Sequence, residues 1–264
     1  MGLAVPVALT IAGSDPSGGA GIQADLKTFH QFGVYGEAVI TLLTVQNTVG
    51  VNRVECMPSD LVAEQIRAVI TDIPPGAAKT GALGNREIIQ AVAEQAADFR
   101  FPLVVDPVLV SKHGAPLIAA DAIEILKTRL LPRAFLVTPN LQEATLLAGI
   151  DVRDVASMRA AAKKILELGP QAVLVKGGHL AGDAIDVLLY KVEWTEFTAR
   201  RIVTRHTHGT GCTYSAAITA SLTAGHDLPT AIRNAKRYIT EAIQTNPGLG
   251  SGSGPVNHHA APNG

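Results

Sequence analysis

Short, continuously apolar runs alternate with helical segments along most of the 264-residue chain. A strand carries an unbroken apolar run when both of its faces are buried, as in a parallel sheet between two layers of helices. The alternation therefore predicts an α/β fold with a mostly parallel central sheet and helices on both faces. The expected strands are Val5–Ala12, Glu37–Val45, Val51–Met57, Ala77–Gly81, Phe101–Val105, Ala134–Val137 and Ala172–Val175.

The segments between these strands carry helix signals. Asn140 and Asp227 stand where an N-cap side chain accepts a backbone N–H, and Asn85 opens a further helix. Ser59 is expected to cap a helix that buries Leu61 and its apolar neighbours on one face. The expected helices are Ile22–Phe32, Ser59–Thr71, Asn85–Ala97, Asp121–Leu130, Leu141–Ala148, Asp154–Leu168, Cys212–Ala224 and Leu228–Thr245.

Near the end of the chain the pattern changes. No internal repeat or interdomain linker is visible, so a single domain over residues 1–264 is expected, with a Gly- and Pro-rich C-terminal tail at 247–264. His258 and His259 lie in this polar tail and are expected to be solvated. Three runs with alternating polarity predict a small antiparallel edge of the sheet. These runs are Ile185–Tyr190, Trp194–Ala199 and Ile202–Thr204.

Composition narrows the class of protein. Hydrophobic residues make up 47% of the chain and charged residues 17%, as in compact globular proteins. The formal net charge of −1 gives no bulk attraction to nucleic acid or to an anionic membrane. Two cysteines, Cys56 and Cys212, are too few for a disulfide framework. The start Leu3–Ala12 is predicted to be a strand rather than a signal peptide, and no apolar run could span a bilayer, so a cytoplasmic location is expected.

The stretch His206–Ala217 contains a glycine-rich turn before an apolar helix. Gly209 and Gly211 lack Cβ atoms, so the backbone can turn sharply and point the N–H groups around Thr210 at one spot. The first helical turn adds unpaired N–H groups and the positive end of its dipole, which predicts a phosphate site. The same field is expected to lower the pKa of the Cys212 thiol. A plain turn with Cys212 as a packing residue is the alternative, and the Lys of a Walker A loop is missing.

Polar or glycine-rich residues follow most of the expected strands. In open α/β sheets, ligands bind at the carboxyl ends of the strands, so this distribution favours a ligand site over a bare scaffold. The first loop has no G-x-G-x-x-G spacing and is expected to cover a small ligand rather than a dinucleotide. The segments at strand ends are Gly13–Gly21, Gln46–Thr48, Gly81, Asp106, Asn140–Glu143 and Lys176–His179.

Four side chains at these ends suit phosphate chemistry. Asp106 is either part of an Asp-Pro turn or a carboxylate that faces a Mg²⁺-bound phosphate. Asn140 and Glu143 have the spacing of a capping box, but Glu143 acting through water would also suit Mg²⁺. Lys176 is either solvated or neutralises a nucleotide phosphate. Together with the glycine turn, these groups provide what phosphoryl transfer needs.

Five segments resemble, in order, those of the hydroxymethylpyrimidine/phosphomethylpyrimidine kinases of thiamine biosynthesis, which belong to the ribokinase-like superfamily. The resemblance implies a ribokinase-like fold, ATP and Mg²⁺ as cofactors, and frequent homodimers. It also implies two successive phosphorylations, of 4-amino-5-hydroxymethyl-2-methylpyrimidine to its monophosphate and then to the diphosphate. The segments are Ala12–Asp25, Gln46–Thr48, Thr138–Glu143, Val175–His179 and Thr207–Cys212, and the likeness extends to Gly254–Val256.

The resemblance further implies roles for individual residues. Cys212 takes the position of the catalytic base, and Gly209, Thr210 and Gly211 form the loop that holds the transferred phosphoryl group. The pyrimidine would lie against Gln46, Gly13, Ala20, Asp25 and Val45. ATP would be contacted by Lys176, Thr207 and Asn140, and Mg²⁺ would be served by Glu143 and Asp106.

Other activities stay open on the sequence alone. Ala82 departs from the bulkier apolar residue, such as Met, that is common in the family, and this smaller side chain could widen the ring pocket. A pyridoxal kinase of the same superfamily is therefore the alternative. A Cys–His hydrolase using Cys212 and His208 would leave Glu143 and Lys176 unexplained, and a noncatalytic nucleotide-binding module would bind without turnover.

Overall fold

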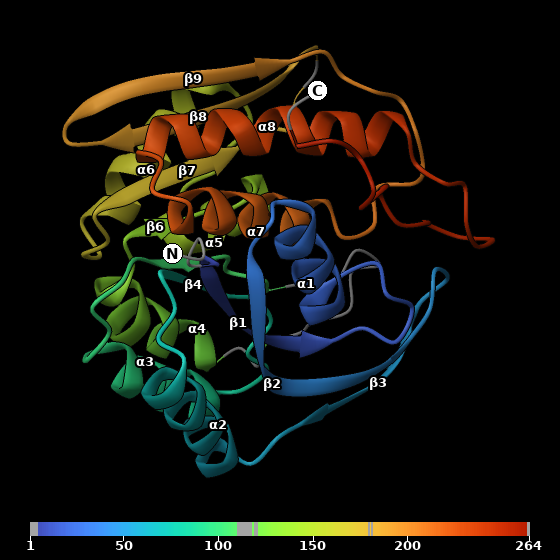
Figure 1. Cartoon of the computed structure of the whole chain (residues 1–264). Coiled ribbons are helices and arrows are strands. Elements are labelled where there is room, and N and C mark those ends of the chain that lie inside the picture. The colour runs from blue at the N-terminus through green and yellow to red at the C-terminus, as the bar shows by residue number, and fades with distance from the viewer. Residues whose placement is uncertain (1–4, 110–117, 119–120, 179, 181, 263–264) are drawn as a thin grey trace.

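The predicted central sheet is present in the computed structural model, which describes residues 5–109, 118, 121–178, 180 and 182–262 (Figure 1). The strands in the middle of the sheet all run parallel to their neighbours, and the strands at its two edges pair antiparallel. The nine strands lie in the order β3 (Val51–Cys56), β2 (Tyr35–Gln46), β1 (Val7–Ser14), β4 (Ala77–Thr80), β5 (Leu103–Val105), β6 (Leu136–Val137), β7 (Ala172–Lys176), β8 (Ala184–Tyr190) and β9 (Glu193–Ala199).

Helices cover both faces of the sheet, as predicted. One face packs against α1 (Gly21–Gln31), α7 (Thr210–Thr223) and α8 (Leu228–Gln244). The other packs against α2 (Ser59–Asp72), α3 (Arg86–Ala96), α4 (Ala122–Ile125), α5 (Leu141–Ala148) and α6 (Val155–Leu166). None of the described helices has the length and apolar character to cross a bilayer.

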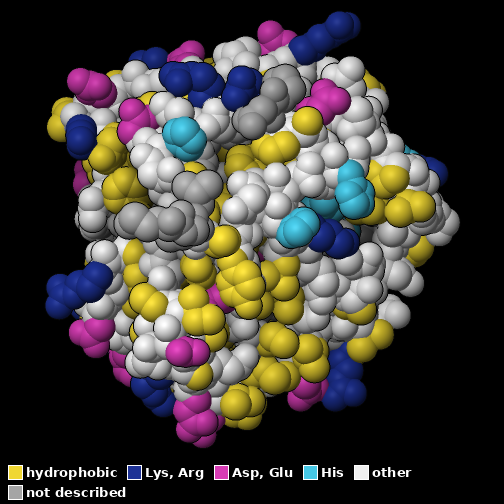
Figure 2. Space-filling model, viewed as in Figure 1, with side chains coloured by type: hydrophobic (Ala, Val, Ile, Leu, Met, Phe, Trp, Pro, Cys, Tyr) yellow, Lys and Arg dark blue, Asp and Glu magenta, His cyan; other side chains and the backbone are white. Residues whose placement is uncertain are grey.

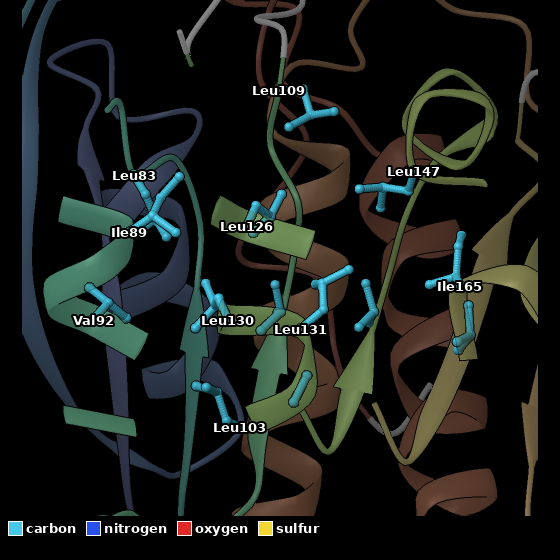
Figure 3. Close-up of a cluster of buried hydrophobic side chains, with 14 of the residues drawn as sticks. Leu83, Ile89, Val92, Leu103, Leu109, Leu126, Leu130, Leu131, Leu147 and Ile165 are labelled. Carbon is cyan, nitrogen blue, oxygen red and sulfur yellow. The ribbon is translucent and has the colours of Figure 1, made fainter. Parts of the chain in front are cut away.

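Side chains alternate between the two faces of each buried strand, so the strands contribute to the hydrophobic cores on both sides of the sheet. Successive side chains of a strand point to opposite faces, so Val104 packs with α7 and α8 while Val105 packs with the other helix layer. Figure 3 shows part of this second core, where Leu103, Leu130 and Val92 lie close together. Burying a side chain of this size stabilises the folded state by about 1.5–3 kcal/mol. The sheet is therefore a rigid support for the polar groups at the ends of its strands.

The antiparallel part of the sheet differs from the prediction in two ways. Besides β8 and β9 on one edge, β3 pairs antiparallel with β2 on the other, because the two are joined as a hairpin. Residues 202–204, predicted as the third edge strand Ile202–Thr204, are not a strand. Val203 is 95% exposed, so this apolar residue has no packing partner that would hold a ladder.

The helix caps at Asn140 and Asp227 are confirmed, since each side chain accepts the predicted backbone N–H. Asn85 precedes α3 as predicted, and its side chain also accepts the Ile88 N–H. The predictions at Ser59 and Leu61 are wrong. Pro58 precedes the first helical residue, no side-chain cap bond forms, and Leu61 is 42% exposed because it lies outside the buried stripe of Val62 and Ile66.

The predicted helix Asp121–Leu130 has two parts. Residues 122–125 form α4, and Leu126–Leu130 continue as a π-helical turn that brings Leu126 and Leu130 into the core.

The C-terminal tail packs on the molecule. The Ser253 N–H donates to the Thr48 carbonyl oxygen at 2.8 Å. His258 is buried and its Nε2 lies 3.1 Å from Thr213 Oγ1, and burial lowers the pKa of His258 to about 4. The expectation of a solvated side chain is therefore wrong for His258 and correct for the exposed His259. In Figure 2, histidine side chains gather in the part of the molecule where the tail lies in Figure 1.

Glu37 on β2 is a buried carboxyl whose oxygens have no hydrogen-bond partner among the described residues. Burial, with a smaller effect of the Asp72 charge, raises the pKa of Glu37 from 4.5 to about 7. Because the folded state then holds a proton that the unfolded chain has lost, the stability present below pH 4.5 is expected to be lost as pH rises through 7.

Glu37→Gln should remove this loss, so the variant should melt at a higher temperature than the wild type at pH 8 but not at pH 4. The exposed Glu55→Gln is the matched control on the neighbouring strand. An unchanged pH dependence of Tm in Glu37→Gln would contradict the prediction.

Candidate active site

Several strand ends and the start of α7 meet at one edge of the sheet. Gln46 ends β2 and Lys176 ends β7, while Asp106 directly follows β5. The parallel pairing of the strands places these ends on the same side, as predicted for a ligand site. His179, at the end of the predicted segment Lys176–His179, lies outside the described residues.

The glycine turn before α7 packs directly on the first loop. Gly209 is the N-cap residue, with a φ of 78°, and a Cβ at this position would collide with the carbonyl oxygen of Gly19. Gly211 lies in the first turn of α7, where a Cβ would be 3.4 Å from Lys176 Nζ. The Thr210 N–H donates to the Thr207 carbonyl oxygen at 3.3 Å. The rest of this helix start, with the positive end of the helix dipole, lies beside the Lys176 ammonium, which suits a phosphate. Thr210 braces the turn, since its hydroxyl donates to the Thr207 carbonyl oxygen at 2.7 Å.

Asp106 and Lys176 form an ion pair next to this turn. Lys176 Nζ lies 2.9 Å from Asp106 Oδ1, and the side chains are only 12% and 2% exposed. Thr138 and Ser215 also donate to the carboxylate, at 3.1 and 3.3 Å. Burial raises the pKa of Asp106, but Lys176 and then Lys79 outweigh it and hold the pKa below its ordinary value. The interpretation of Lys176 as a solvated lysine is thus wrong.

Asn140 and Glu143 form the predicted capping box at the start of α5. Asn140 Oδ1 accepts the Glu143 N–H at 2.9 Å, and Glu143 Oε2 accepts the Asn140 N–H at 2.8 Å. Glu143 is 6% exposed, and its burial raises the pKa to about 7 although Lys176 opposes the rise. A capped helix start explains the spacing but not the burial of this carboxyl beside the Lys176 ion pair.

The acidic residues at this edge fit one kind of metal ion. Within the described part of the chain, no group of three or more His, Cys, Asp or Glu side chains is placed to hold a metal. Mg²⁺ needs no such cage, because it usually keeps several waters and takes one or two carboxylates together with substrate phosphates. Glu143 and Asp106 match that donor set.

Cys212 lies in the first turn of α7 and is half-buried. The prediction of a lowered pKa is wrong: burial raises the pKa of the thiol to about 12, and Lys79 opposes this rise only in part. The negative charges of Asp25 and Asp106 add to the rise. The helix start is a local feature of the sequence, whereas these acids lie far away along the chain and could not be anticipated from it. Cys212 is therefore a thiol at neutral pH.

Asp25 has no exposed surface, so the expected contact with the pyrimidine is not available to it in this structure. Its Oδ2 accepts hydrogen bonds from Lys79 Nζ at 2.8 Å and from the Thr10 hydroxyl at 2.6 Å. Lys79 is also fully buried and lies near Cys212 and Asp106. Asp25 is therefore part of an ionic network beneath the site rather than of its surface.

The other residues expected to hold the pyrimidine lie on neighbouring strands. Gly13 lies near the end of β1, which pairs with β2, where Gln46 is the last residue and Val45 is 54% exposed. Ala20 is the N-cap residue of α1. The side chain of Gln46 contacts His208, which in turn packs against Gly19, next to Ala20. Gln46 and Ala20 are thus brought to the same place.

His208, in the glycine turn before α7, links this turn to the first loop and to the end of β2. Its Nε2 lies 2.8 Å from Asp15 Oδ2 and 3.2 Å from the Gln46 amide. No hydrogen bond among the described residues joins His208 to Cys212, which argues against a Cys–His hydrolase. No role for Asp15 or Lys79 was predicted from the sequence. A lysine inside the apolar run Ala77–Gly81 was the available signal for Lys79. The turn at Asp15 has a local signal, because its carboxylate accepts the Ser17 N–H two positions on, but its contact with His208, 193 positions away, has none.

The fold is that of a ribokinase-like kinase, and at one edge of its sheet the start of α7 lies beside the buried Lys176–Asp106 pair, with Gln46 at the end of β2. The chain belongs to the phosphomethylpyrimidine kinase family, whose model matches residues 15–257.

Curated relatives agree with this assignment. The chain is 49% identical over 253 residues to the hydroxymethylpyrimidine/phosphomethylpyrimidine kinase of Streptomyces coelicolor, covering 96% of this chain and 94% of that one. It is 50% identical over 252 residues to the thiamine biosynthesis bifunctional protein ThiED of Geobacter sulfurreducens. That match covers 95% of this chain but only 51% of the longer relative.

Solved structures of two activities share the fold. Phosphomethylpyrimidine kinase from Clostridium difficile is 45% identical with a TM-score of 0.81, covering 90% of this chain and 99% of that one. Pyridoxal kinase from Bacillus subtilis, solved as an ADP complex, is 38% identical with a TM-score of 0.90, covering 97% of this chain and 98% of that one.

Proposed function

We propose that this chain is an ATP- and Mg²⁺-dependent kinase that phosphorylates 4-amino-5-hydroxymethyl-2-methylpyrimidine and then its monophosphate to the diphosphate. The observation that carries the proposal is the arrangement of one edge of the sheet. The start of α7 lies between the Lys176–Asp106 pair on one side and Gln46 on the other. A phosphate donor and a ring alcohol can thus meet over Cys212.

Each part of this edge has a task in the proposed reaction. The N–H groups around Gly209–Gly211 would hold the transferred phosphoryl group, and Lys176 would neutralise charge on the nucleotide. Glu143 and Asp106 would hold Mg²⁺, which supplies positive charge against the phosphates. Thr207 and Asn140 would contact ATP. The ADP complex of the Bacillus subtilis relative supports an adenine nucleotide as the donor.

Mass spectrometry of the products formed from the pyrimidine alcohol and Mg-ATP tests the proposal. Two successive gains of one phosphoryl group are expected, and the absence of both products would overturn it. Incubation of the purified monophosphate separates the second step from the first.

A pyridoxal kinase is the second candidate. The pyridoxal kinase neighbour matches with a TM-score of 0.90, and Ala82 offers more room beside the ring than a larger side chain would. Competition between the pyrimidine alcohol and pyridoxal in one reaction ranks the two substrates by kcat/KM, and the pyrimidine is expected to win.

We further propose a cytoplasmic homodimer. Leu43, Val45 and Val49 around the end of β2 are 45%, 54% and 63% exposed, which is a suitable apolar contact for a second copy. Size-exclusion chromatography with light scattering measures the state, and Val45→Glu should shift a dimer towards monomer.

Gln46→Leu is expected to raise the KM for the pyrimidine strongly while the KM for ATP changes little. An amide offers both a donor and an acceptor to an aminopyrimidine edge, and each ring group left unpaired costs about 1–3 kcal/mol. Steady-state kinetics with each substrate varied in turn measures the effect. Asn47→Leu, at the exposed neighbouring position, is the control. An unchanged KM for the pyrimidine would refute the role of Gln46.

Glu143→Gln is expected to weaken Mg²⁺ binding but to preserve the fold. A glutamine also completes a capping box, so Tm should change little if capping is the main structural task. The Mg²⁺ concentration for half-maximal rate should rise, and excess Mg²⁺ should restore part of the activity. Asp154 caps α6 far from the site, and Asp154→Asn is the control for capping alone. Full activity of Glu143→Gln at low Mg²⁺ would mean that Glu143 only caps α5 and does not serve the metal ion.

A further inference from the structure

His208 is a buried side chain that the proposed phosphoryl transfer leaves without a task. It is 3% exposed, and its Nε2 approaches both Asp15 Oδ2 at 2.8 Å and the Gln46 amide at 3.2 Å. Its Nδ1 has no hydrogen-bond partner among the described residues. Both polar contacts of the ring therefore use the same nitrogen atom.

The charge state of Asp15 determines whether the hydrogen between its carboxylate and His208 Nε2 is carried by the histidine. Its carboxylate accepts the backbone N–H groups of Ser17 and Ala20, each at 2.9 Å. Burial raises the pKa of Asp15, but the hydrogen bonds from His208 and Ser17 outweigh it and hold the pKa below its ordinary value. An ionised carboxylate only accepts, so His208 must carry a hydrogen on Nε2.

That hydrogen fixes the orientation of the Gln46 amide. A nitrogen that carries a hydrogen in the ring plane cannot accept another from an NH₂ group. The oxygen and nitrogen ends of an amide have the same shape, so the surrounding network decides which end points where. The structure places Gln46 Nε2 3.2 Å from His208 Nε2, which would set two donors against each other. The network therefore requires the amide to be turned by about 180°, so that Oε1 faces His208 and shares the Nε2 hydrogen with Asp15. Oε1 keeps one lone pair, and the NH₂ group keeps both of its hydrogens.

The His208 ring is held in place from both sides. A Cβ at Gly19 would lie only 2.5 Å from His208 Cδ2, so the first loop packs against the ring edge. The His208 N–H donates to the Gly254 carbonyl oxygen at 3.0 Å, and its own carbonyl oxygen accepts the Val256 N–H at 3.3 Å. The tail and the first loop thus prevent the ring from turning away from Gln46.

We propose that His208 is a positioning residue that sets the order of acceptor and donor on Gln46 and thereby selects rings with an amino group beside a ring nitrogen. Such an edge offers one donor and one acceptor side by side, which a fixed amide can pair with simultaneously. A pyridoxal-type ring has no amino group next to its nitrogen. The inference rests on the proposed function, since Gln46 must face the substrate ring.

Two substitutions at His208 distinguish the role of Nε2 from that of Nδ1. The amide nitrogen of an asparagine lies near the position of Nδ1, whereas that of a glutamine reaches the position of Nε2 and can donate to Asp15. His208→Asn is expected to raise the KM for the pyrimidine alcohol roughly 10-fold, about the worth of one hydrogen bond, with the KM for ATP within about twofold. The kcat/KM preference for the pyrimidine over pyridoxal should fall by a similar factor. His208→Gln should recover most of both losses.

His258→Asn is the control for loss of a buried histidine. Its Nε2 contacts Thr213 in α7, and no hydrogen bond among the described residues joins it to Gln46 or Asp15, so Tm should fall without a change in substrate preference. Unchanged pyrimidine KM and preference in His208→Asn would overturn the positioning role while the wild type still turns over the alcohol. A wild type that forms no phosphorylated pyrimidine would instead overturn the proposed function.

A measurement without substitution tests the same step. Nitrogen-15 NMR of histidine-labelled wild-type protein distinguishes the two neutral tautomers and assigns the hydrogen of His208. Nε2–H is expected, and a hydrogen on Nδ1 alone would overturn the inference even if His208→Asn does not fold.

Discussion

Replacing Cys212 by alanine is expected to lower kcat by roughly 10²–10⁴-fold, the usual contribution of a general base. The fold and the KM values should change little, because the thiol is small and half-buried at the start of α7. In the proposed reaction, the thiolate form of Cys212 takes the proton of the substrate hydroxyl and becomes the thiol, while the N–H groups of the turn hold the phosphoryl group. Single-turnover kinetics with saturating Mg-ATP measures the chemical step.

The raised pKa gives this prediction a second observable. Because burial places the pKa of Cys212 at about 12, only a small fraction is thiolate at neutral pH, and kcat should rise with pH well beyond 8. Cys212→Asp would place an ionised carboxylate at the same position, so the residual rate should lose this alkaline rise. Cys56→Ala is the control, since that thiol lies at the end of β3, away from α7. A wild-type rate in Cys212→Ala would make Cys212 a packing residue.

The parts of this site that follow from the sequence are those with a local cause. The cap at Asn140 depends on residues three positions apart, and the sharp turn at Gly209 depends on one missing Cβ. The position of Lys176 at a strand end follows from an apolar run that stops there. Parallel pairing then brings such ends together, and this is why the apolar runs of the sequence are enough to group Gln46, Asp106 and Lys176.

The parts that the sequence could not supply depend on contacts between distant residues. The pKa of Cys212 is set by burial, by Lys79 and by acids on other elements, and the helix start alone predicted the wrong direction. Asp25 lies in a segment that resembles the family, yet its side chain turns inward to Lys79, 54 positions away. The position of Asp25 on the inner side of α1, against β4, becomes visible only when the sheet order is known.

The second large effect is expected at this buried pair. Lys79 Nζ and Asp25 Oδ2 lie 2.8 Å apart, and neither side chain has any exposed surface. Burial raises the pKa of Asp25, and the Lys79 ammonium opposes that rise. Asp25 Oδ1 has no hydrogen-bond partner among the described residues, and Oδ2 accepts from the neutral Thr10 hydroxyl as well as from Lys79. Lys79 therefore supplies the counter-charge for this buried carboxylate.

Lys79→Met is therefore expected to destabilise the fold by about 3–5 kcal/mol, because it leaves Asp25 buried without its counter-charge. Asp25→Leu alone should be similarly harmful, since it leaves the ammonium uncompensated. The double variant Lys79→Met/Asp25→Leu removes both charges and should recover most of the loss, because apolar replacement of a whole buried pair is often neutral. Urea unfolding of the four proteins gives the coupling free energy directly.

The exposed pair Arg53–Glu55 on β3 provides the matched control. Its side chains are 69% and 57% exposed, and Arg53→Met should cost no more than about 1 kcal/mol. If Lys79→Met were as mild as Arg53→Met, Asp25 would have to be protonated in the native state, and the buried contact would be a neutral hydrogen bond. If instead both single variants unfold and the double variant is stable, the pair is ionic, and the positive charge beneath Cys212 is fixed by the fold itself.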